Sequence, residues 1–480
     1  MRNAETGEGF PADDFARLRG TDPMLYASRM SQDELSNEKT RSVVSAILED
    51  GAIVEMVYRR EAQDTALLVY SDGENTEHKW LDAGSQGRIG PYSPRNNLLT
   101  HRVVLFPSGV GDYERTDQLL AAVRSFIHSY ADLSTIFEEV ASYYVLLTWI
   151  YDSFSEVPYL RLKGDYGTGK SRCLLAIGSL CYKPMFVSGA STVSPIFRIL
   201  DSFRGTLVMD ESDFRFSDEK AEIVKILNNG NAEGFPVLRS EVTPTKEFNP
   251  RAFTVFGPKI IATRRDFDDR ALESRCITEV MRGLPPRSDI PLSLPDTFHD
   301  EARELRNKLL AYRFRNFARR RDPSGAREQE IEARVAQVFS SLLAVVEDDN
   351  ARKRILDLAR KQSETIRADR GQSIEALLLG IILDMRRESC PLGVKEIAER
   401  FADRHQGDFA RPITPRWVGA QIKRRLSLAT VKSHGTFVIP QTEEDKLLAL
   451  FERFDSGDDR VDVGILGTSS EATSAQKQGN

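Results

Sequence analysis

Residues 159–179 read YLRLKGDYGTGKSRCLLAIGS, and this stretch decides the fold class that we expect. Its first part alternates apolar and polar side chains, which is typical of a strand, and its last part has apolar residues at helical spacing. Between them lie Gly164, Gly167 and Gly169, which allow backbone conformations that other residues avoid. The stretch therefore predicts a strand, a glycine-rich loop and a helix in direct succession, as in parallel α/β sheets.

The glycine-rich loop matches the pattern G-x-x-x-x-G-K-S/T from Gly164 to Ser171. In such a loop the backbone N–H groups point toward a phosphate chain, and the helix that follows adds its positively polarised end. We expect Lys170 to reach the β- and γ-phosphate oxygens and Ser171 to bind Mg²⁺. The predicted cofactors are therefore ATP and Mg²⁺, and the predicted cofactor-binding residues are Gly164, Gly167, Thr168, Gly169, Lys170, Ser171 and Arg172.

Two adjacent carboxylates follow forty residues later, in the segment GTLVMDES. Three apolar residues predict a buried strand, and Asp210 and Glu211 stand at its carboxyl end. A magnesium nucleotide site requires carboxylates at this place. We expect Asp210, with Ser171, to hold the metal and Glu211 to polarise an attacking water, so the pair favours hydrolysis over group transfer.

A hairpin and an arginine complete the pattern. Residues 234–256 contain two β-like runs around a turn, and the apolar strand 259–263 follows and ends at the polar Thr263. This order favours a ring-forming motor over a simple nucleotide kinase. Arg275 ends a short predicted helix, from which an arginine can reach the γ-phosphate bound to a neighbouring subunit. An intramolecular salt bridge is the alternative for Arg275.

The ordered set GDYGTGKS, TLVMDE, NNGNAEGFPVLRSE, FGPKIIAT and ALESRC resembles the AAA+ ATPases with a hairpin before the sensor-1 strand. These include the superfamily 3 and minichromosome maintenance helicases. The resemblance covers about residues 116–320. It looks closest to the helicase-type ATPases of phages, plasmids and other mobile elements, some of which are fused to primases.

The resemblance implies further roles. Thr263 falls at the sensor-1 position, although superfamily 3 members usually have Asn there, and Lys246 falls in the hairpin turn, where those helicases place a basic residue that grips DNA. Phe248 lies nearby, and an ordinary exposed turn lysine is the alternative for Lys246. The predicted catalytic residues are Lys170, Glu211, Arg275 and Thr263.

The C-terminal part predicts a winged helix. Residues 391–406 and 413–426 read as two helices, the second with Thr414 as its cap and Pro415 in its first turn, and a β-like pair follows. The second helix of a winged helix usually enters the major groove, although such domains also dock proteins. The predicted nucleic-acid contacts are Lys246, Phe248, Arg416, Lys423, Arg424 and Lys432, with Arg425 and His434 beside them.

The segment 312–321, YRFRNFARRR, interleaves aromatic and basic residues. We expect an amphipathic helix here, with Phe314 and Phe317 on one face and the arginines in solvent on the other. Stacking of the aromatic residues on a single strand is the less favoured alternative.

Composition sets the remaining limits. The 480 residues carry a formal charge of −6 and are 40% hydrophobic, so several domains are expected and any DNA contact must come from local basic patches. The four cysteines and six histidines form neither a C-x-x-C pair nor an H-E-x-x-H motif, which disfavours a disulfide framework and a zinc site. We expect no membrane segment and a cytoplasmic location.

The predicted fold class is α/β: an AAA+ P-loop ATPase core with a parallel sheet, an N-terminal β-rich domain, a helical segment and a C-terminal winged helix. The expected boundaries are 1–38 and 455–480 for disordered termini, 41–110 for the β-rich domain, 111–155 for a helical linker or collar, 156–284 for the ATPase core, 297–388 for the helical region and 389–454 for the winged helix.

These features together predict an ATP-dependent DNA translocase or helicase that acts as a hexameric ring in the replication of a mobile element or phage. DNA, further copies of the chain, and a primase or another replication protein are the expected partners. An ATP-gated assembly or loading factor is one alternative, and a replication initiator that binds DNA without unwinding it is another. The β-rich segment 41–110 gives no functional signal.

Overall fold

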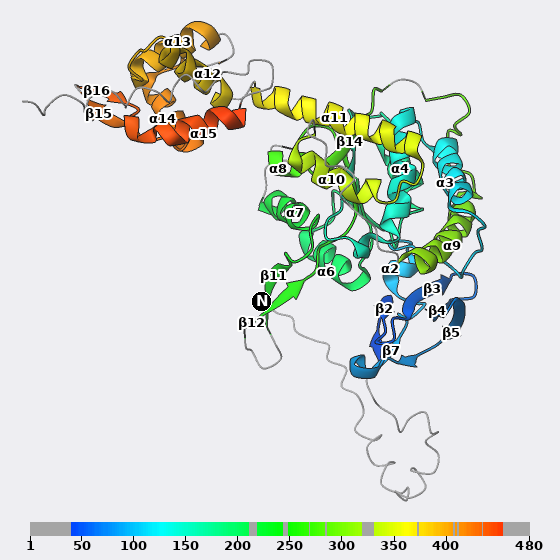
Figure 1. Cartoon of the computed structure of the whole chain (residues 1–480). Coiled ribbons are helices and arrows are strands. Elements are labelled where there is room, and N and C mark those ends of the chain that lie inside the picture. Colours follow the sequence, from blue (N-terminus) through cyan, green and yellow to red (C-terminus); the bar gives the residue numbers. More distant parts are fainter. Residues whose placement is uncertain are drawn as a thin grey trace, which may run out of the picture. The chain divides into compact units, whose positions relative to one another are not determined.

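The structure is a computed structural model, and it describes residues 40–210, 218–242, 248–267, 269–283, 286–318, 331–371, 374–406, 409, 412–433 and 435–454. The chain divides into two units, one of Met1–Asp266 with Ile277–Arg320 and the other of Phe267–Cys276 with Arg321–Asn480. Figure 1 labels their helices and strands. Across the described ranges, no helix is both long enough and apolar enough to span a membrane.

A five-stranded sheet forms the centre of the first unit, in the order β14-β8-β13-β10-β9. The strands are β8 (Tyr159–Lys163), β9 (Met185–Ser188), β10 (Leu207–Asp210), β13 (Lys259–Thr263) and β14 (Cys276–Val280). The pairs β8–β13, β13–β10 and β10–β9 are parallel, and Lys163 lies opposite Thr263. The expected α/β class with a parallel sheet is therefore confirmed.

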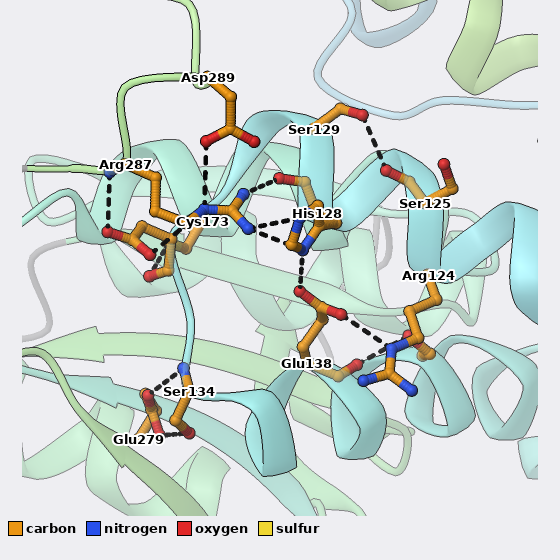
Figure 2. A network of polar contacts seen from close by, with 12 residues as sticks. Arg124, Ser125, His128, Ser129, Ser134, Glu138, Cys173, Glu279, Arg287 and Asp289 are labelled. Carbon is orange, nitrogen blue, oxygen red and sulfur yellow. Dashed lines mark hydrogen bonds and ion pairs between the residues drawn. The ribbon is translucent and has the colours of Figure 1, made fainter.

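Six helices of this unit are α3 (Thr116–Tyr130), α4 (Thr135–Thr148), α5 (Lys170–Gly178), α6 (Val193–Phe203), α7 (Asp218–Asn229) and α9 (Phe298–Asn316). Helix α4 is buried from Phe137 onward because its sequence is apolar on every side. Glu138, in the first turn of α4, has hydrogen-bond partners on α3 (Figure 2). It accepts from Arg124 at 2.8 Å and contacts His128 at 2.7 Å.

The N-terminal part of the first unit is an antiparallel sheet in the order β2-β3-β4-β5. Its strands are β2 (Ser45–Ile47), β3 (Ile53–Arg59), β4 (Asp64–Ser71) and β5 (Glu74–His78); β1 (Arg41–Ser42), β6 (Leu81–Asp82) and β7 (Arg88–Gly90) form a second small sheet, and α2 (Asn97–Thr100) follows. Strands that follow one another along the chain pair through short turns, so this sheet forms from local contacts.

A buried cluster of charges joins this N-terminal sheet to α9. Glu55 on β3 accepts from Tyr182 Oη at 2.5 Å and from Arg313 Nε at 2.7 Å, and Lys183 Nζ lies 3.2 Å away. The guanidinium of Arg313 also donates to both carboxylate oxygens of Asp152, at 2.8 and 2.7 Å. Burial lowers the pKa of Lys183 to about 8. We call these five residues the charge cluster.

The charge cluster corrects one expectation. Arg313 belongs to the segment 312–321, whose arginines were expected in solvent, yet its side chain is 1% exposed. The neighbouring Tyr312 and Phe314 are buried as well. The expectation was wrong for Arg313 because the side of α9 that carries it is packed against the fold, whereas the neighbouring Arg315 is exposed. A buried arginine is tolerated where carboxylates pair with it.

A hairpin stands between α7 and β13, as the sequence predicts. Its strands β11 (Val237–Val242) and β12 (Phe248–Phe253) are antiparallel, with Val242 opposite Phe248. Lys259 closes its base: the fully buried Nζ donates to the carbonyls of Gly230, Val255 and Gly257 at 3.0, 3.0 and 2.9 Å. All three ammonium donors are thereby used.

The second unit contains α8 (Arg270–Glu273), α10 (Ala333–Leu343), α11 (Asp349–Gly371), α12 (Ile374–Arg387), α13 (Val394–His405), α14 (Pro415–Arg425), α15 (Glu444–Phe454) and the strands β15 (Val431–Ser433) and β16 (Thr436–Val438). One apolar core joins α12 to α15 and includes Ile382, Phe401 and Ile422. The hydroxyl of Thr414 accepts from Trp417 N at 3.3 Å, so the predicted cap of α14 is confirmed.

Candidate functional site

The loop between β8 and α5 has the geometry of a phosphate cradle. A Cβ atom at Gly164 would lie 2.8 Å from both the Cβ and the carbonyl oxygen of Met281, so no other residue fits there. Gly167 and Gly169 have φ angles of +76° and +84°, in the left-handed region that favours glycine. The sequence pattern thus reflects one close approach and two backbone turns.

Lys170 spans this loop. Its Nζ donates to the carbonyls of Gly164 at 2.7 Å and Asp165 at 2.6 Å, which holds the ammonium group across the mouth of the loop. Helix α5 begins at Lys170, with Gly169 as a cap that offers no side-chain acceptor. The first N–H groups of a helix have no acceptor within the helix, so this end can donate to an anion. Ser171 is exposed in the first turn.

The carboxyl ends of β8, β10 and β13 meet at one edge of the sheet, beside the loop. Asp210 ends β10 and Thr263 ends β13. Thr263 is 2% exposed, and its hydroxyl has no hydrogen-bond partner within the described ranges. A buried hydroxyl without a partner costs about 1–3 kcal/mol of stability. A ligand oxygen that accepted a hydrogen bond from this hydroxyl would remove that cost. The cradle and this hydroxyl fit a nucleoside triphosphate.

Sequence reasoning missed a carboxylate near this edge. Asp266 lies three residues after Thr263 and accepts from Lys163 Nζ at 2.7 Å and from Arg161 at 3.3 Å. Arg161 is buried and also donates to the hydroxyl of Thr278 at 3.0 Å. Asp266 therefore pairs with both cations of β8, Arg161 and Lys163. Two basic residues at alternate positions of a buried strand were the available signal.

Beside the loop, Arg172 contacts the segment 286–292 that follows β14, which we call the connector. The guanidinium of Arg172 donates to the carbonyls of Pro291 and Leu292 at 3.0 and 2.8 Å. Figure 2 shows how the same connector is tied to α3, where Arg287 contacts the ring of His128 at 2.8 Å. The backbone N–H of Arg287 also donates to Asp132, just after α3, at 3.3 Å. The side chain of Arg172 thus fixes the connector, and its role in cofactor binding stays a prediction.

Several predicted residues lie elsewhere. Glu211, Lys246 and His434 fall outside the described residues, as does the side chain of Phe248, whose backbone begins β12. Arg275 belongs to the second unit, directly after α8, and is half-buried. The structure therefore brings Lys170, Ser171, Asp210 and Thr263 together and leaves the roles of the others as predictions.

The basic residues of α14 and β15 gather in the second unit. Arg416, Lys423, Arg424 and Lys432 are exposed, and Lys423 Nζ lies 5.9 Å from the centre of the Phe437 ring. Arg425 differs, because it donates to Glu375 at 2.8 Å. Exposed cations on one helix and the adjacent hairpin form a surface that can contact phosphates.

No protein-family model matches the sequence, and no curated protein matches it. Among solved structures, the apo form of the C-terminal region of NrS-1 is 10% identical, with a TM-score of 0.36, over 80% of this chain and 96% of that chain. A JCV helicase with a bound small molecule is 13% identical over 52% and 61%, with a TM-score of 0.24. A Drosophila ORC structure with DNA is 14% identical over 71% and 94%, with a TM-score of 0.20. All three TM-scores lie below 0.5, so the site described above stands on its own geometry.

Proposed function

We propose that the protein is a magnesium-dependent ATPase. The observation that supports this most directly is the convergence of the glycine loop, Lys170 and the partnerless hydroxyl of Thr263 at one sheet edge. The backbone N–H groups of the loop and Lys170 would hold the β- and γ-phosphates, and Ser171 and Asp210 would hold Mg²⁺. Bound Mg²⁺ would neutralise charge on these phosphates. Glu211 would orient the attacking water.

The further proposal is that ATP hydrolysis moves DNA. Strand β13 supports it, because its two ends face the two parts of the proposed motor. Thr263 ends the strand beside the proposed nucleotide site, and Lys259 begins it with hydrogen bonds to the base of the hairpin. Arg239 on β11 also bonds to Glu222 on α7 with two contacts of 3.1 Å. The hairpin is therefore fixed to the strand that would sense the γ-phosphate. Phe235, at its base, is 64% exposed and is available to a strand of DNA.

Ring assembly is part of the same proposal. Arg275 would supply positive charge to the nucleotide of a neighbouring subunit, and six copies would enclose the DNA. The exposed cations of α14 and β15 would contact DNA as a winged helix, with Arg416 and Arg424 on phosphates. Replication of a mobile element or phage is the setting that we propose for this motor.

The test is to measure ATP hydrolysis with and without single-stranded DNA, and the mass of the particle with and without a slowly hydrolysed ATP analogue. We expect DNA to raise the rate and the analogue to produce a hexamer. A rate that ignores DNA, together with a monomer under all conditions, would contradict the motor. A separate variant, Glu211→Gln, distinguishes the motor from the alternative loading factor: a loading factor would be held in its partner-bound state, whereas a motor would retain DNA without unwinding it.

A further inference from the structure

A small pocket of about 60 Å³ lies in the first unit, where the end of β3, the segment after α2 and the start of α9 meet. Its charged lining consists of Arg60, Glu61, Arg102, Asp300, Arg303 and Arg306, and we call it the arginine pocket. His299 and apolar residues complete the wall. None of these residues belongs to the phosphate loop or to the hairpin.

The arginine pocket holds more positive than negative charge. Arg303 pairs with Glu61 at 2.9 Å and with Asp300 at 3.1 Å, which uses both carboxylates. Within the described part of the chain, Arg60, Arg102 and Arg306 form no ion pair. With four arginines and two carboxylates in its lining, the pocket therefore keeps an excess of two positive charges.

Arg306 is the deepest of these cations. It is 6% exposed, and among the residues that the structure describes its guanidinium donates to two carbonyls alone, those of Ser179 at 2.6 Å and Phe106 at 3.3 Å. A buried cation without a carboxylate is costly. Burial and the nearby Arg303 and Arg102 lower the pKa of Arg306 to about 9. The pKa of His299 is lowered by burial and by the positive charges of Arg102, Arg306 and Arg60.

We propose that the arginine pocket binds one phosphate group. A volume of 60 Å³ holds a group the size of a few water molecules, which suits a tetrahedral oxyanion and excludes a nucleoside. Planar guanidinium groups match phosphate oxygens in pairs, and a dianion would balance the two excess charges. The proposal does not depend on the proposed ATPase. The phosphate comes either from free inorganic phosphate or from the end of a nucleic-acid strand.

The test first replaces Lys170, so that phosphate binding by the loop is weakened. In a Lys170→Ala chain we expect calorimetry to detect binding of inorganic phosphate. Arg102→Gln in that background should weaken it about tenfold, since one charge-assisted contact is lost, and Arg60→Gln should act in the same direction. The matched control is Arg95→Gln, an exposed turn arginine outside the pocket, which should leave the affinity unchanged. Thermal unfolding of each variant checks that it is folded.

A second readout is the His299 imidazole, followed by NMR. Phosphate should raise its pKa, because the anion offsets Arg60, Arg102, Arg303 and Arg306, which face it together with Glu61 and Asp300. Phosphate binding that is absent in the Lys170→Ala chain, or equal affinity in the Arg102 and Arg95 variants, would overturn the proposal. Failure of ATP hydrolysis in the parent chain would leave this result untouched.

The source of the phosphate is assigned with two single-stranded oligonucleotides of the same sequence, one 5′-phosphorylated and one with a 5′-hydroxyl. Tighter binding of the phosphorylated strand, lost on Arg102→Gln, supports the proposal and assigns the pocket to a strand end. Binding of free phosphate without any preference between the strands supports it and assigns a small phosphate. If neither probe responds to Arg102→Gln, the proposal fails.

Discussion

The phosphate loop and the arginine pocket both concentrate positive charge, but the chain assembles them in opposite ways. In the loop, eight consecutive residues supply the glycines, Lys170 and the helix N-terminus. In the pocket, the charges come from three segments, and Arg60 and Arg306 are far apart in the sequence. A site made from consecutive residues leaves a pattern in the sequence, whereas a site made from separate segments is visible only after folding.

Two arginines of α9 extend this comparison. Arg306 and Arg313 are both buried on the same helix. Arg313 is neutralised by Glu55 and Asp152, while Arg306 donates to carbonyls alone. A buried arginine can therefore have either of two consequences. Paired with carboxylates, it joins parts of the fold; without them, its positive charge remains available to an anion.

The largest expected effect concerns the charge cluster. Arg313→Ala leaves Asp152 without its cation and Glu55 with Lys183 alone, and we expect the free energy of unfolding to fall by about 3–5 kcal/mol. Urea unfolding, followed by the fluorescence of the buried Trp149 in a chain with Trp80→Phe and Trp417→Phe, measures it. The control is Arg315→Ala, which removes an exposed pair with Asp112 and should cost under about 1 kcal/mol. An equal loss of stability in the Arg313 and Arg315 variants would show that the buried charge cluster contributes no more than an exposed ion pair.

The next effect concerns the loop. Lys170→Ala should lower the rate of ATP hydrolysis about 100-fold, because a positioned cation on the transferring phosphate is lost. The free energy of unfolding should change little, since Lys170 is only partly buried. A colorimetric assay of released phosphate at saturating ATP is the measurement. Full activity in the variant would show that the loop does not hold the nucleotide.

A pH effect is expected at Lys259. Burial lowers its pKa to about 7, whereas an unfolded lysine has a pKa of about 10.4. Between these values the unfolded chain binds the extra proton, so stability rises with pH, by at most about 1.4 kcal/mol per pH unit. Urea unfolding between pH 6.5 and 9 should show this rise in the parent chain and a smaller one in Lys259→Met. Lys183 contributes from about pH 8 in both chains and cancels in the difference. Parallel curves would refute this assignment.

The smallest effect concerns Thr263. Thr263→Val removes a buried hydroxyl without a partner, so the free energy of unfolding should stay equal or rise by up to about 1 kcal/mol. Hydrolysis should fall about tenfold if the hydroxyl contacts the γ-phosphate, as one lost hydrogen bond implies. Unfolding and phosphate release are compared in the same preparation. A marked loss of stability would mean that the hydroxyl has a structural role.

Much of the site could be predicted because its residues lie at the ends of elements with a clear pattern. The strand before Gly164, the helix after it and the strand that ends at Asp210 are all present. The two basic residues of β8 indicated that an acidic partner was needed, but nothing in the local sequence of Asp266 shows that Lys163 and Arg161 lie beside it. The burial of Arg313 was also hidden, since its carboxylate partners stand far away in the chain.

The strand–loop–helix unit, the α/β class and the hairpin before β13 follow from residues that are close together in the chain, because spacing, glycine conformation and hydrophobic period act over a few residues. Which cations are neutralised, which donate to carbonyls and which remain in excess follows only from the folded arrangement. The physical reason is that the energy of a buried charge depends on the partners within a few ångströms, and folding brings those partners from distant segments.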